Sequence, residues 1–486
     1  MLTYSSTRSN EPVSSARAVV NGLASDGGLY TMAASDIPGI ELSGLVSLDY
    51  YELASKIVSK LLPDFSEAEA LELVRRAYTG KFSSSELTPT VSVADKHVLE
   101  LFHGPTSAFK DMALCLLPHL MKHSAEKCGN KDDIMILTAT SGDTGKAAME
   151  GFRDVDGIRI IVFYPRDGVS AVQKAQMATQ EGRNVTVCSV EGNFDDAQSG
   201  VKNIFENVRG RGLSSANSIN IGRLVPQVVY YFYSYFSLVR DGSISLGDEV
   251  SFCVPTGNFG DILAGYIAKQ MGLPCGKFIC ASNENNVLTD FINTGVYDRR
   301  RPFHKTASPS MDILISSNLE RLLYLMSGDT ALVASLMQQL KSDGHYTVPA
   351  ELLEKIQSDF CAYCCDDAAA LETIGRIWKD EHYLCDTHTA VAWNAAEQYQ
   401  AQSGDKTPIV VLSTASAYKF PAAVLQGIGL ECAGDEFDMM TCLEDASKVP
   451  MPENLRGLRE REVLHFDCVR PEAMQDYVIG KLEEKA

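Results

Sequence analysis

One lysine, Lys110, stands where an amine could react with an aldehyde. It lies in the segment His-Gly-Pro-Thr-Ser-Ala-Phe-Lys-Asp (103–111), between an expected strand over 98–102 and an expected helix. Apolar Ala108 and Phe109 precede it, and Gly104 and Pro105 constrain the turn. An amine held against apolar surface loses part of its hydration, which lowers its pKa and makes it a better nucleophile. Lys110 is therefore the first candidate for a catalytic residue.

Two glycine-rich turns downstream share one arrangement, because each follows an apolar run and precedes a helical pattern. The first is Thr-Ala-Thr-Ser-Gly-Asp-Thr-Gly-Lys (138–146), and the second is Pro-Thr-Gly-Asn-Phe-Gly-Asp (255–261). Glycines let the backbone approach a ligand closely, and the free N–H groups of the following helix then face it. One such turn alone would be an ordinary connection. Two of them, beside Lys110, indicate sites for phosphate.

The first turn does not fit a nucleotide-binding motif. A P-loop needs glycine, four residues and then Gly-Lys-Ser/Thr, whereas Thr140 occupies the first position here. Ala147 follows Gly145-Lys146 and cannot ligate magnesium. No Gly-x-Gly-x-x-Gly follows an expected strand either, so a dinucleotide site is unsupported.

Segments spread over nearly the whole chain carry a family pattern. In chain order they are Tyr4–Arg8, Gly22–Leu29, His103–Asp111, Thr138–Gly145, Ser215–Asn220, Gly257–Asp261, Ser308–Asp312, Asp386–Ala392, Ser413–Ala415 and Lys419–Phe420. Together they resemble threonine synthase, a family of the fold type II pyridoxal-phosphate enzymes. One departure is Ala417, where the family often has proline.

The resemblance implies a role for each candidate site residue. Lys110 would form the Schiff base with pyridoxal 5′-phosphate. The cofactor-binding residues would be Gly257, Asn258, Phe259 and Gly260, through their backbone N–H groups, with Asp261 beside them and Thr414 near the pyridine nitrogen. The implied substrate is O-phospho-L-homoserine, and its second anion site would be formed by Ser141 and Thr144, with Asn220 and Arg223 as weaker candidates.

The implied reaction is a β,γ-replacement that yields L-threonine and phosphate, the last step of threonine biosynthesis. Two alternatives stay open. A threonine-synthase-like phospho-lyase would use the same lysine but release a 2-oxo acid, because the two outcomes differ only in where water adds. A non-catalytic sensor of a phosphorylated ligand could share the fold, although an intact Lys110 with both anion turns argues against it.

Apolar runs alternate with helical patterns beyond residue 90, which favours α/β domains with parallel sheets. Strands are expected at 134–139, 158–164, 185–190, 250–254, 278–281 and 409–412. Lys110, both turns and Ser413-Thr414 follow such strands, where ligands bind in these folds. The resemblance adds a tryptophan synthase β-like arrangement with the cofactor in the cleft between two domains. The expected divisions are an N-terminal domain (1–90), a large cofactor-binding domain (91–130 and 226–430), a small domain (131–225) and a C-terminal extension (431–486).

Composition indicates a globular protein with a small-molecule substrate. The net charge of −20 argues against nucleic acid and anionic membranes as partners, and an anionic substrate then requires a locally positive cleft. No apolar signal segment is visible near the N-terminus, and the longest apolar stretch (224–239) is too short and too interrupted to span a bilayer. A cytoplasmic monomer or homodimer is expected.

Thirteen cysteines scattered through the chain fit a reducing compartment better than a disulfide framework. Cys361, Cys364 and Cys385 with His382 and His388 could suggest zinc. We expect Cys361 and Cys364 instead to be small core residues of a helical stretch over 352–377, and we expect no metal site.

Overall fold

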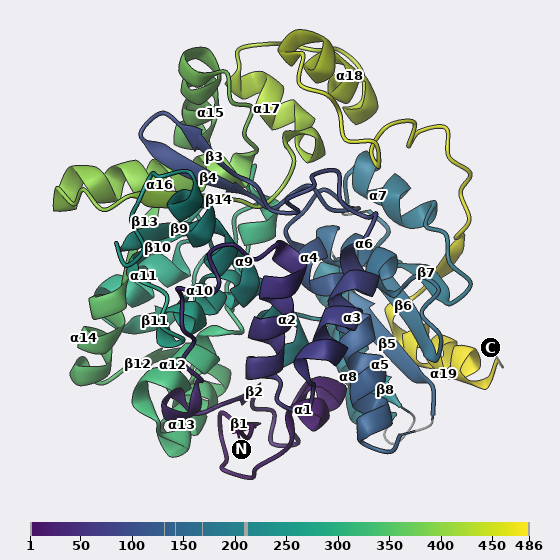
Figure 1. The fold of residues 1–486 in the computed structure, drawn as a ribbon. Coiled ribbons are helices and arrows are strands. Elements are labelled where there is room, and N and C mark those ends of the chain that lie inside the picture. The colour runs from purple at the N-terminus through teal and green to yellow at the C-terminus, as the bar shows by residue number, and fades with distance from the viewer. Residues whose placement is uncertain (1, 131, 141, 168, 209–211, 485–486) are drawn as a thin grey trace.

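Two parallel sheets organise the chain. The computed structural model describes residues 2–484 except 131, 141, 168 and 209–211. A large sheet has the strand order β13-β10-β9-β14-β4-β3, and a small sheet has the order β15-β7-β6-β5-β8. Neighbouring strands in both sheets run parallel, except that β3 pairs antiparallel with β4. Helices cover both sheets (Figure 1), which confirms the expected α/β class.

The strands coincide with the apolar runs of the sequence. The large sheet consists of β3 (Thr90–Val93), β4 (Lys96–Glu100), β9 (Val250–Pro255), β10 (Cys275–Ser282), β13 (Phe360–Cys364) and β14 (Ile409–Ser413). The small sheet consists of β5 (Ile134–Ala139), β6 (Ile158–Pro165), β7 (Val185–Val190), β8 (Leu213–Ser214) and β15 (Asp467–Val469). Every residue of β9 is buried, because helices cover a parallel sheet on both faces.

Alternate residues of β9 enter different cores. Phe252 belongs to the core that contains α9 (Ile221–Arg240) and α10 (Gly260–Gln270). Cys253 belongs to the core that contains α15 (Asp367–Glu381) and α16 (Thr387–Ser403). Helix α9 is the long apolar stretch of the sequence, and it is buried along most of its length. Among the residues that the structure describes, no helix combines the length and hydropathy needed to cross a membrane.

The N-terminal region packs against α9. It contains β1 (Ser5–Ser6), α1 (Ser15–Asn21), β2 (Tyr30–Thr31), α2 (Tyr50–Leu61) and α3 (Glu67–Tyr78). Asp49 and Glu52 form a capping box at the start of α2, and Ser66 and Glu69 form another at the start of α3.

Further helices surround the sheets, and a two-stranded ribbon lies beside the large sheet. Along the chain these elements are α4 (Lys110–Leu114), α5 (Leu117–Lys127), α6 (Asp143–Phe152), α7 (Ala171–Ala178), α8 (Phe194–Asn207), α11 (Val287–Thr294), β11 (Val296–Asp298), α12 (Leu319–Ser327), α13 (Thr330–Ser342), β12 (His345–Thr347), α14 (Ala350–Asp359), α17 (Pro421–Gly427), α18 (Glu436–Ser447) and α19 (Met474–Glu483).

The expected helical stretch over 352–377 is wrong. It contains α14, then strand β13, then α15, and Cys361 lies on the strand, paired with Ile279 of β10. Burial alternates along β13 with a period of two, as in a strand at the edge of a sheet. Both flanking helices are amphipathic, and their longer patterns made this short strand look like part of one helix. The side chain of Asp366 caps the N-terminus of α15, where the helical structure begins again.

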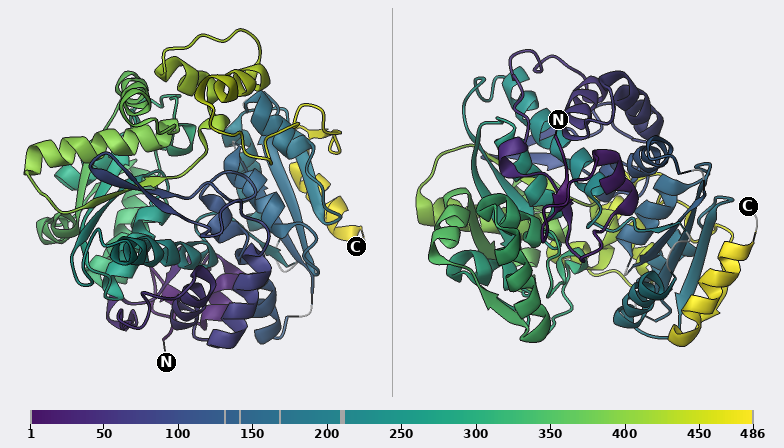
Figure 2. Two further views of the ribbon diagram at one scale, coloured as in Figure 1. Left: turned by 45° about the horizontal axis from the view of Figure 1, so that its top comes forward. Right: turned by 90° about the horizontal axis from the view of Figure 1, so that it is seen from below.

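The C-terminal extension completes the small sheet. Strand β15 pairs with β7, and Met474 and Val478 of α19 join the core beneath the small sheet. Figure 2 shows this last segment beside the small sheet, far from α18 on the large body. The division into four domains stays a prediction. The small sheet, however, includes β15, which lies in the C-terminal extension and not in the expected small domain.

Candidate functional site

Lys110 is the first residue of α4. The loop before it is hydrogen-bonded to the last residue of β14 and to the residue that follows. The N–H of Leu101 donates to the Ser413 carbonyl at 2.9 Å, and the N–H of Phe109 donates to the Thr414 carbonyl at 2.8 Å. The Lys110 amine lies 4.7 Å from the centre of the Phe109 ring. The structure therefore brings Thr414 next to the lysine loop, as the order of the parallel strands requires.

The turn before Lys110 is closed by Asp111. Its carboxylate accepts hydrogen bonds from the N–H of Thr106 at 2.8 Å and from the Thr106 hydroxyl at 2.5 Å. A Cβ at Gly104 would lie 2.5 Å from this carboxylate, so only glycine fits there. Burial raises the pKa of Asp111 to about 6, although these hydrogen bonds oppose the shift.

The environment of Lys110 lowers the pKa of its amine to about 8. Burial is the largest cause, although the residue keeps part of its surface accessible. Nearby Asp143 opposes the shift, whereas the positive charges of Lys419 and Arg223 add to it. The lowered pKa of Lys110 and its main cause, burial, agree with the interpretation of the sequence.

The second glycine-rich turn, between β9 and α10, presents backbone N–H groups. Within the described part of the chain, the N–H groups of residues 257–261 have no protein acceptor. Phe259 adopts a left-handed conformation (φ 58°), and the Ser310 carbonyl lies 2.8 Å from the position of a Cβ at Gly257. The carbonyl of Gly257 instead accepts from the Ser316 hydroxyl at 2.7 Å. This turn has the free donors and the helix N-terminus that fit a phosphate group.

Asp261, in the first turn of α10, anchors the turn to α9. One of its carboxylate oxygens accepts from the hydroxyls of Tyr230 at 2.5 Å and Tyr231 at 3.0 Å. Burial raises the pKa of Asp261 to about 6. The side chain is thus turned to the tyrosines of α9.

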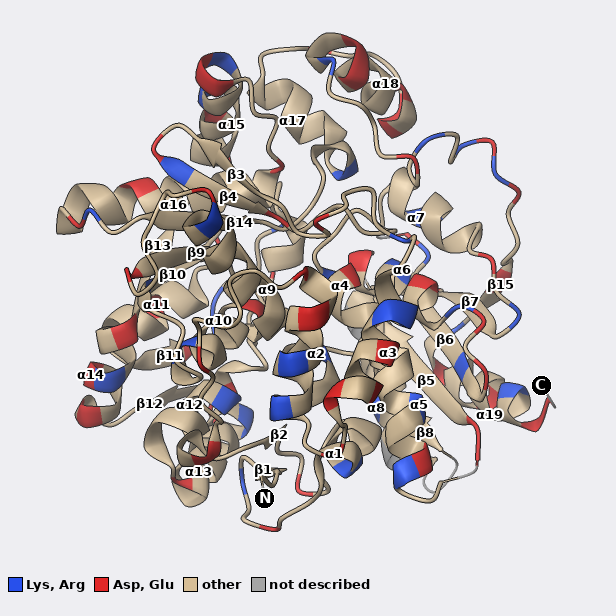
Figure 3. Ribbon diagram, viewed as in Figure 1, with Lys and Arg blue, Asp and Glu red and all other residues tan. Residues whose placement is uncertain are grey.

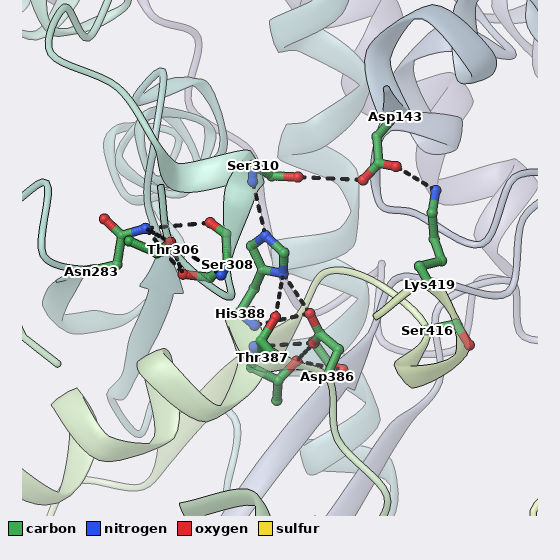
Figure 4. Close-up of polar contacts among 12 residues, drawn as sticks. Asp143, Asn283, Thr306, Ser308, Ser310, Asp386, Thr387, His388, Ser416 and Lys419 are labelled. Atoms are coloured by element: carbon green, nitrogen blue, oxygen red, sulfur yellow. Dashed lines mark hydrogen bonds and ion pairs between the residues drawn. The ribbon is translucent and has the colours of Figure 1, made fainter. Parts of the chain in front are cut away.

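The first glycine-rich turn contributes a buried ion pair. The carboxylate of Asp143 lies 2.7 Å from the amine of Lys419 (Figure 4). The same amine donates to the Thr106 carbonyl at 3.1 Å. Burial alone would raise the pKa of Asp143, but Lys419 and Lys110 together hold it well below its usual value. Thr144 follows on α6, partly exposed, and Ser141 lies outside the described residues.

A chain of hydrogen bonds runs from Asp143 to Asp386 (Figure 4). The Ser310 hydroxyl donates to Asp143 at 3.3 Å, and the Ser310 N–H donates to Nε2 of His388 at 3.1 Å. Because Nε2 accepts, the ring carries its proton on Nδ1, which lies 2.7 Å from the Asp386 carboxylate. His388 therefore fixes the segment that covers Gly257.

Arg223, in the first turn of α9, is a buried cation that has no paired carboxylate among the described residues. One guanidinium nitrogen donates to the Ala216 carbonyl at 2.7 Å. Among the described residues its buried Nε has no hydrogen-bond partner, and no acidic side chain raises its pKa, which burial lowers to about 10. An unpaired buried guanidinium suits a carboxylate or phosphate ligand.

Asn220 has a structural position beside Arg223. Its side-chain oxygen accepts from the Gly222 N–H at 2.9 Å and caps α9, and its amide nitrogen donates to the Val19 carbonyl at 3.0 Å. With both ends of the amide bonded within the protein, this geometry favours capping over ligand contact.

Positive and negative side chains nearly balance around Lys110. The cations Lys110, Lys419 and Arg223 meet the carboxylates of Asp143, Asp111 and Asp261. Over the outer elements, acidic and basic residues are interspersed (Figure 3). Side-chain charges alone thus give no clear excess of positive charge, and the locally positive cleft expected for an anionic ligand stays a prediction that depends on helix N-termini and on Arg223.

No group of three or more metal-ligating side chains gathers in the parts of the chain that the structure describes. Cys361 lies on edge strand β13, and burial raises the pKa of its thiol to about 12. Cys385 is buried, 1% exposed.

Family models match three consecutive parts of the chain. Residues 97–415 match the model described as pyridoxal-phosphate dependent enzyme. Residues 3–78 match the threonine synthase N terminus, and residues 389–478 match the C-terminal part of threonine synthase.

Similar proteins carry related names. Threonine synthase-like 1 from Homo sapiens is 43% identical over 85% of this chain, and this chain spans only 58% of that relative. Threonine synthase from Saccharomyces cerevisiae is 39% identical, covering 87% of this chain and 88% of the relative. The crystal structure of PLP-bound threonine synthase from Brucella melitensis has a TM-score of 0.88 at 37% identity and covers 100% of both chains.

Proposed function

This chain belongs to the threonine synthase family of pyridoxal-phosphate-dependent enzymes, and on that premise we propose that it converts O-phospho-L-homoserine and water to L-threonine and phosphate. One observation carries the proposal. Lys110, with its lowered pKa, is close enough for its charge to affect Asp261, which follows the N–H groups of residues 257–260, and for the Arg223 guanidinium, which has no paired carboxylate among the described residues, to lower its own pKa. A reactive amine between two such sites suits an aldehyde cofactor and a substrate that both carry phosphate.

The family's cofactor is pyridoxal 5′-phosphate, which supplies, when bound, an aldehyde for Lys110 and a ring that stores negative charge. The N–H groups of Gly257, Asn258, Phe259 and Gly260 would hold its phosphate. Thr414, only 5% exposed, would place its hydroxyl at the ring nitrogen. A neutral hydroxyl, unlike a carboxylate, need not keep that nitrogen protonated.

Lys110 would also move the protons of the reaction. Its amine would remove the proton at Cα of the substrate and one at Cβ, and phosphate would leave from Cγ. Protons would then return to Cγ and Cα, while water adds its hydroxyl at Cβ. With a pKa of about 8, about a tenth of the amines are unprotonated at pH 7, against well under 1% for an ordinary lysine. The lowered pKa thus makes one side chain usable as a base near neutrality.

The substrate's anionic groups would meet Arg223 and the N-terminus of α6, where Thr144 lies. Ser141 is included in this proposal on the basis of the sequence alone, because it lies outside the described residues. Asn220 would contribute by fixing the start of α9 and so the position of Arg223.

Replacing Arg223 with glutamine should raise KM for O-phospho-L-homoserine about 10- to 100-fold, because a charged hydrogen bond worth roughly 1.5–3 kcal/mol is lost. Binding of the cofactor, followed by its absorbance, should stay near the wild-type level. Initial rates over a range of substrate concentrations measure the effect. Without substrate, the variant should be at least as stable as wild type, because an unpaired buried charge has been removed.

Arg240→Gln is the matched control, since Arg240 ends the same helix at the protein surface. An unchanged KM in Arg223→Gln would remove Arg223 from the substrate site.

A phospho-lyase that releases 2-oxobutyrate remains the second candidate. Membership of the family does not separate the two functions, because relatives named threonine synthase-like 1 are 43–44% identical to this chain and the yeast threonine synthase is 39% identical. Both functions use Lys110 identically and differ after phosphate has left.

One assay with O-phospho-L-homoserine should distinguish these functions, if phosphate, threonine and 2-oxobutyrate are measured together. We expect phosphate matched by threonine. Phosphate matched by 2-oxobutyrate would establish the phospho-lyase. Bound cofactor without phosphate release would show that the substrate is wrong, and purified protein without cofactor absorbance would favour the sensor. The cytoplasmic location and the monomeric or homodimeric state stay predictions.

A further inference from the structure

The C-terminal extension reaches the lysine loop as well as the small sheet. Residues 449–466, here called the strap, join α18 to β15 (Figure 1). The strap is fixed at its start, where Leu455 and Leu458 are buried in the core of the large body. At its end, the N–H of Leu464 donates to the Ala178 carbonyl at 2.8 Å, after α7. Directly before Leu455, at Asn454, the strap contacts the loop that carries Lys110.

Asn454 makes the contact between the strap and this loop. Its side-chain nitrogen donates to the Pro105 carbonyl at 2.7 Å, and its side-chain oxygen accepts from the Ser107 hydroxyl at 2.9 Å. Because a proline carbonyl can only accept, the orientation of the amide is fixed. One side chain therefore bridges two positions of the turn that leads into Lys110.

Ser107 has an unfavourable backbone conformation that needs support. Its φ is 57°, in the left-handed region that a residue with a Cβ rarely adopts. The residue is 1% exposed, its N–H donates to the Gly104 carbonyl, and its carbonyl accepts from the Ser416 N–H. A relaxed Ser107 would redirect the chain three residues before Lys110.

We propose that Asn454 is a positioning residue for Lys110, which holds Ser107 in its left-handed conformation and thereby keeps the amine against Phe109. This inference rests on the proposed function, because it takes Lys110 to be the reactive amine. The strap contributes no group to the chemistry itself. It supplies the long-range contact that makes the strained turn the preferred one.

The test uses the full-length protein with its cofactor and compares Asn454→Ala, Ser107→Gly and the double variant. The absorbance of the bound cofactor is titrated against pH, and kcat and KM are measured separately. For Asn454→Ala we expect an upward shift of the pH midpoint by about one unit, since a looser loop admits water and favours the charged form at Lys110. We also expect kcat to fall at least about 10-fold, because a base displaced by a fraction of an ångström loses most of its efficiency, with KM little changed.

The Ser107→Gly replacement provides the decisive comparison. Glycine adopts a positive φ without strain, so it should restore most of the kcat that Asn454→Ala loses. Glu453→Ala, which removes an exposed neighbour on the strap, should leave the midpoint and kcat unchanged. Should Asn454→Ala fail to fold, Asn454→Asp tests the Pro105 half of the contact, because it keeps the acceptor for Ser107 but replaces the donor to Pro105 with a charged oxygen that repels the carbonyl.

An unchanged midpoint and kcat in the Asn454 variants would overturn the inference, and so would an equal loss with and without Ser107→Gly. The midpoint does not depend on which product forms. A wild-type protein that binds cofactor but makes no threonine would therefore refute the proposed function, while the midpoint still decides the role of Asn454. A wild-type protein without cofactor absorbance would refute both.

Discussion

Replacing Lys110 with alanine should reduce the turnover of O-phospho-L-homoserine by at least about 10⁴-fold, because the variant loses both the cofactor's covalent partner and the proton-transfer base. The protein should fold and still bind pyridoxal 5′-phosphate, since the N–H groups of residues 257–260 belong to the backbone. Single-turnover measurements with cofactor in excess would quantify the loss, and equilibrium dialysis would measure cofactor retention.

Lys96→Met is the matched control for this variant. Lys96 is also buried, 2% exposed, but it begins β4, the strand whose opposite end leads to Lys110. Turnover by Lys110→Ala within 10-fold of wild type would contradict the assignment of Lys110 as the catalytic residue.

Replacing Asp143 with asparagine should destabilise the folded protein by about 3–5 kcal/mol, because Lys419 would remain buried without its partner. Denaturant unfolding at neutral pH measures this free energy. The depressed pKa of Asp143 means that its stabilising effect is present above the pKa of an unfolded aspartate, near pH 4, and is lost as the pH falls further. The difference from wild type should therefore shrink in acid.

The same variant should lower the pKa of Lys110 below about 8. The negative charge of Asp143 raises that pKa, and the positive charge of Lys419 lowers it. Without Asp143, the effect of Lys419 is no longer opposed. The pH dependence of amine labelling at Lys110 in cofactor-free protein, read by mass spectrometry, measures the shift.

The double variant with Lys419→Met provides a control for the interpretation. It should recover most of the lost stability, because no uncompensated charge remains. A loss below about 1 kcal/mol in Asp143→Asn alone would mean that solvent or another group already compensates Lys419.

Local patterns were sufficient to predict which segments after strands the structure brings together. Lys110, the turn at 257–260 and Thr414 each come directly after an apolar run, and parallel strands bring such ends together. The central strands were predictable for the same reason, because buried parallel strands are uninterrupted apolar segments, whereas the edge strands β13 and β15 are partly exposed and were missed.

Partners that lie far apart in the sequence were missed. Nothing near Asp143 indicates that Lys419 neutralises it, and nothing near Ser107 indicates Asn454. His388 was considered for zinc, whereas it supports the Ser310 segment through its ring. Asn220 was predicted to contact the ligand, whereas its amide caps α9. The sequence alone does not separate these two roles, because an asparagine at the start of a helix can serve either.

The strand order of the large sheet dictates when the site can exist during synthesis. Strand β14 lies between β9 and β4, so the strand before Lys110 and the strand before the turn at 257–260 are joined only through residues 409–413, and they cannot be joined before these residues have left the ribosome. The contact of Asn454 with Pro105 closes a separation of 349 residues. A nascent chain therefore carries both halves of the site unjoined for most of translation, and such non-local pairing slows folding and lengthens the exposure to aggregation.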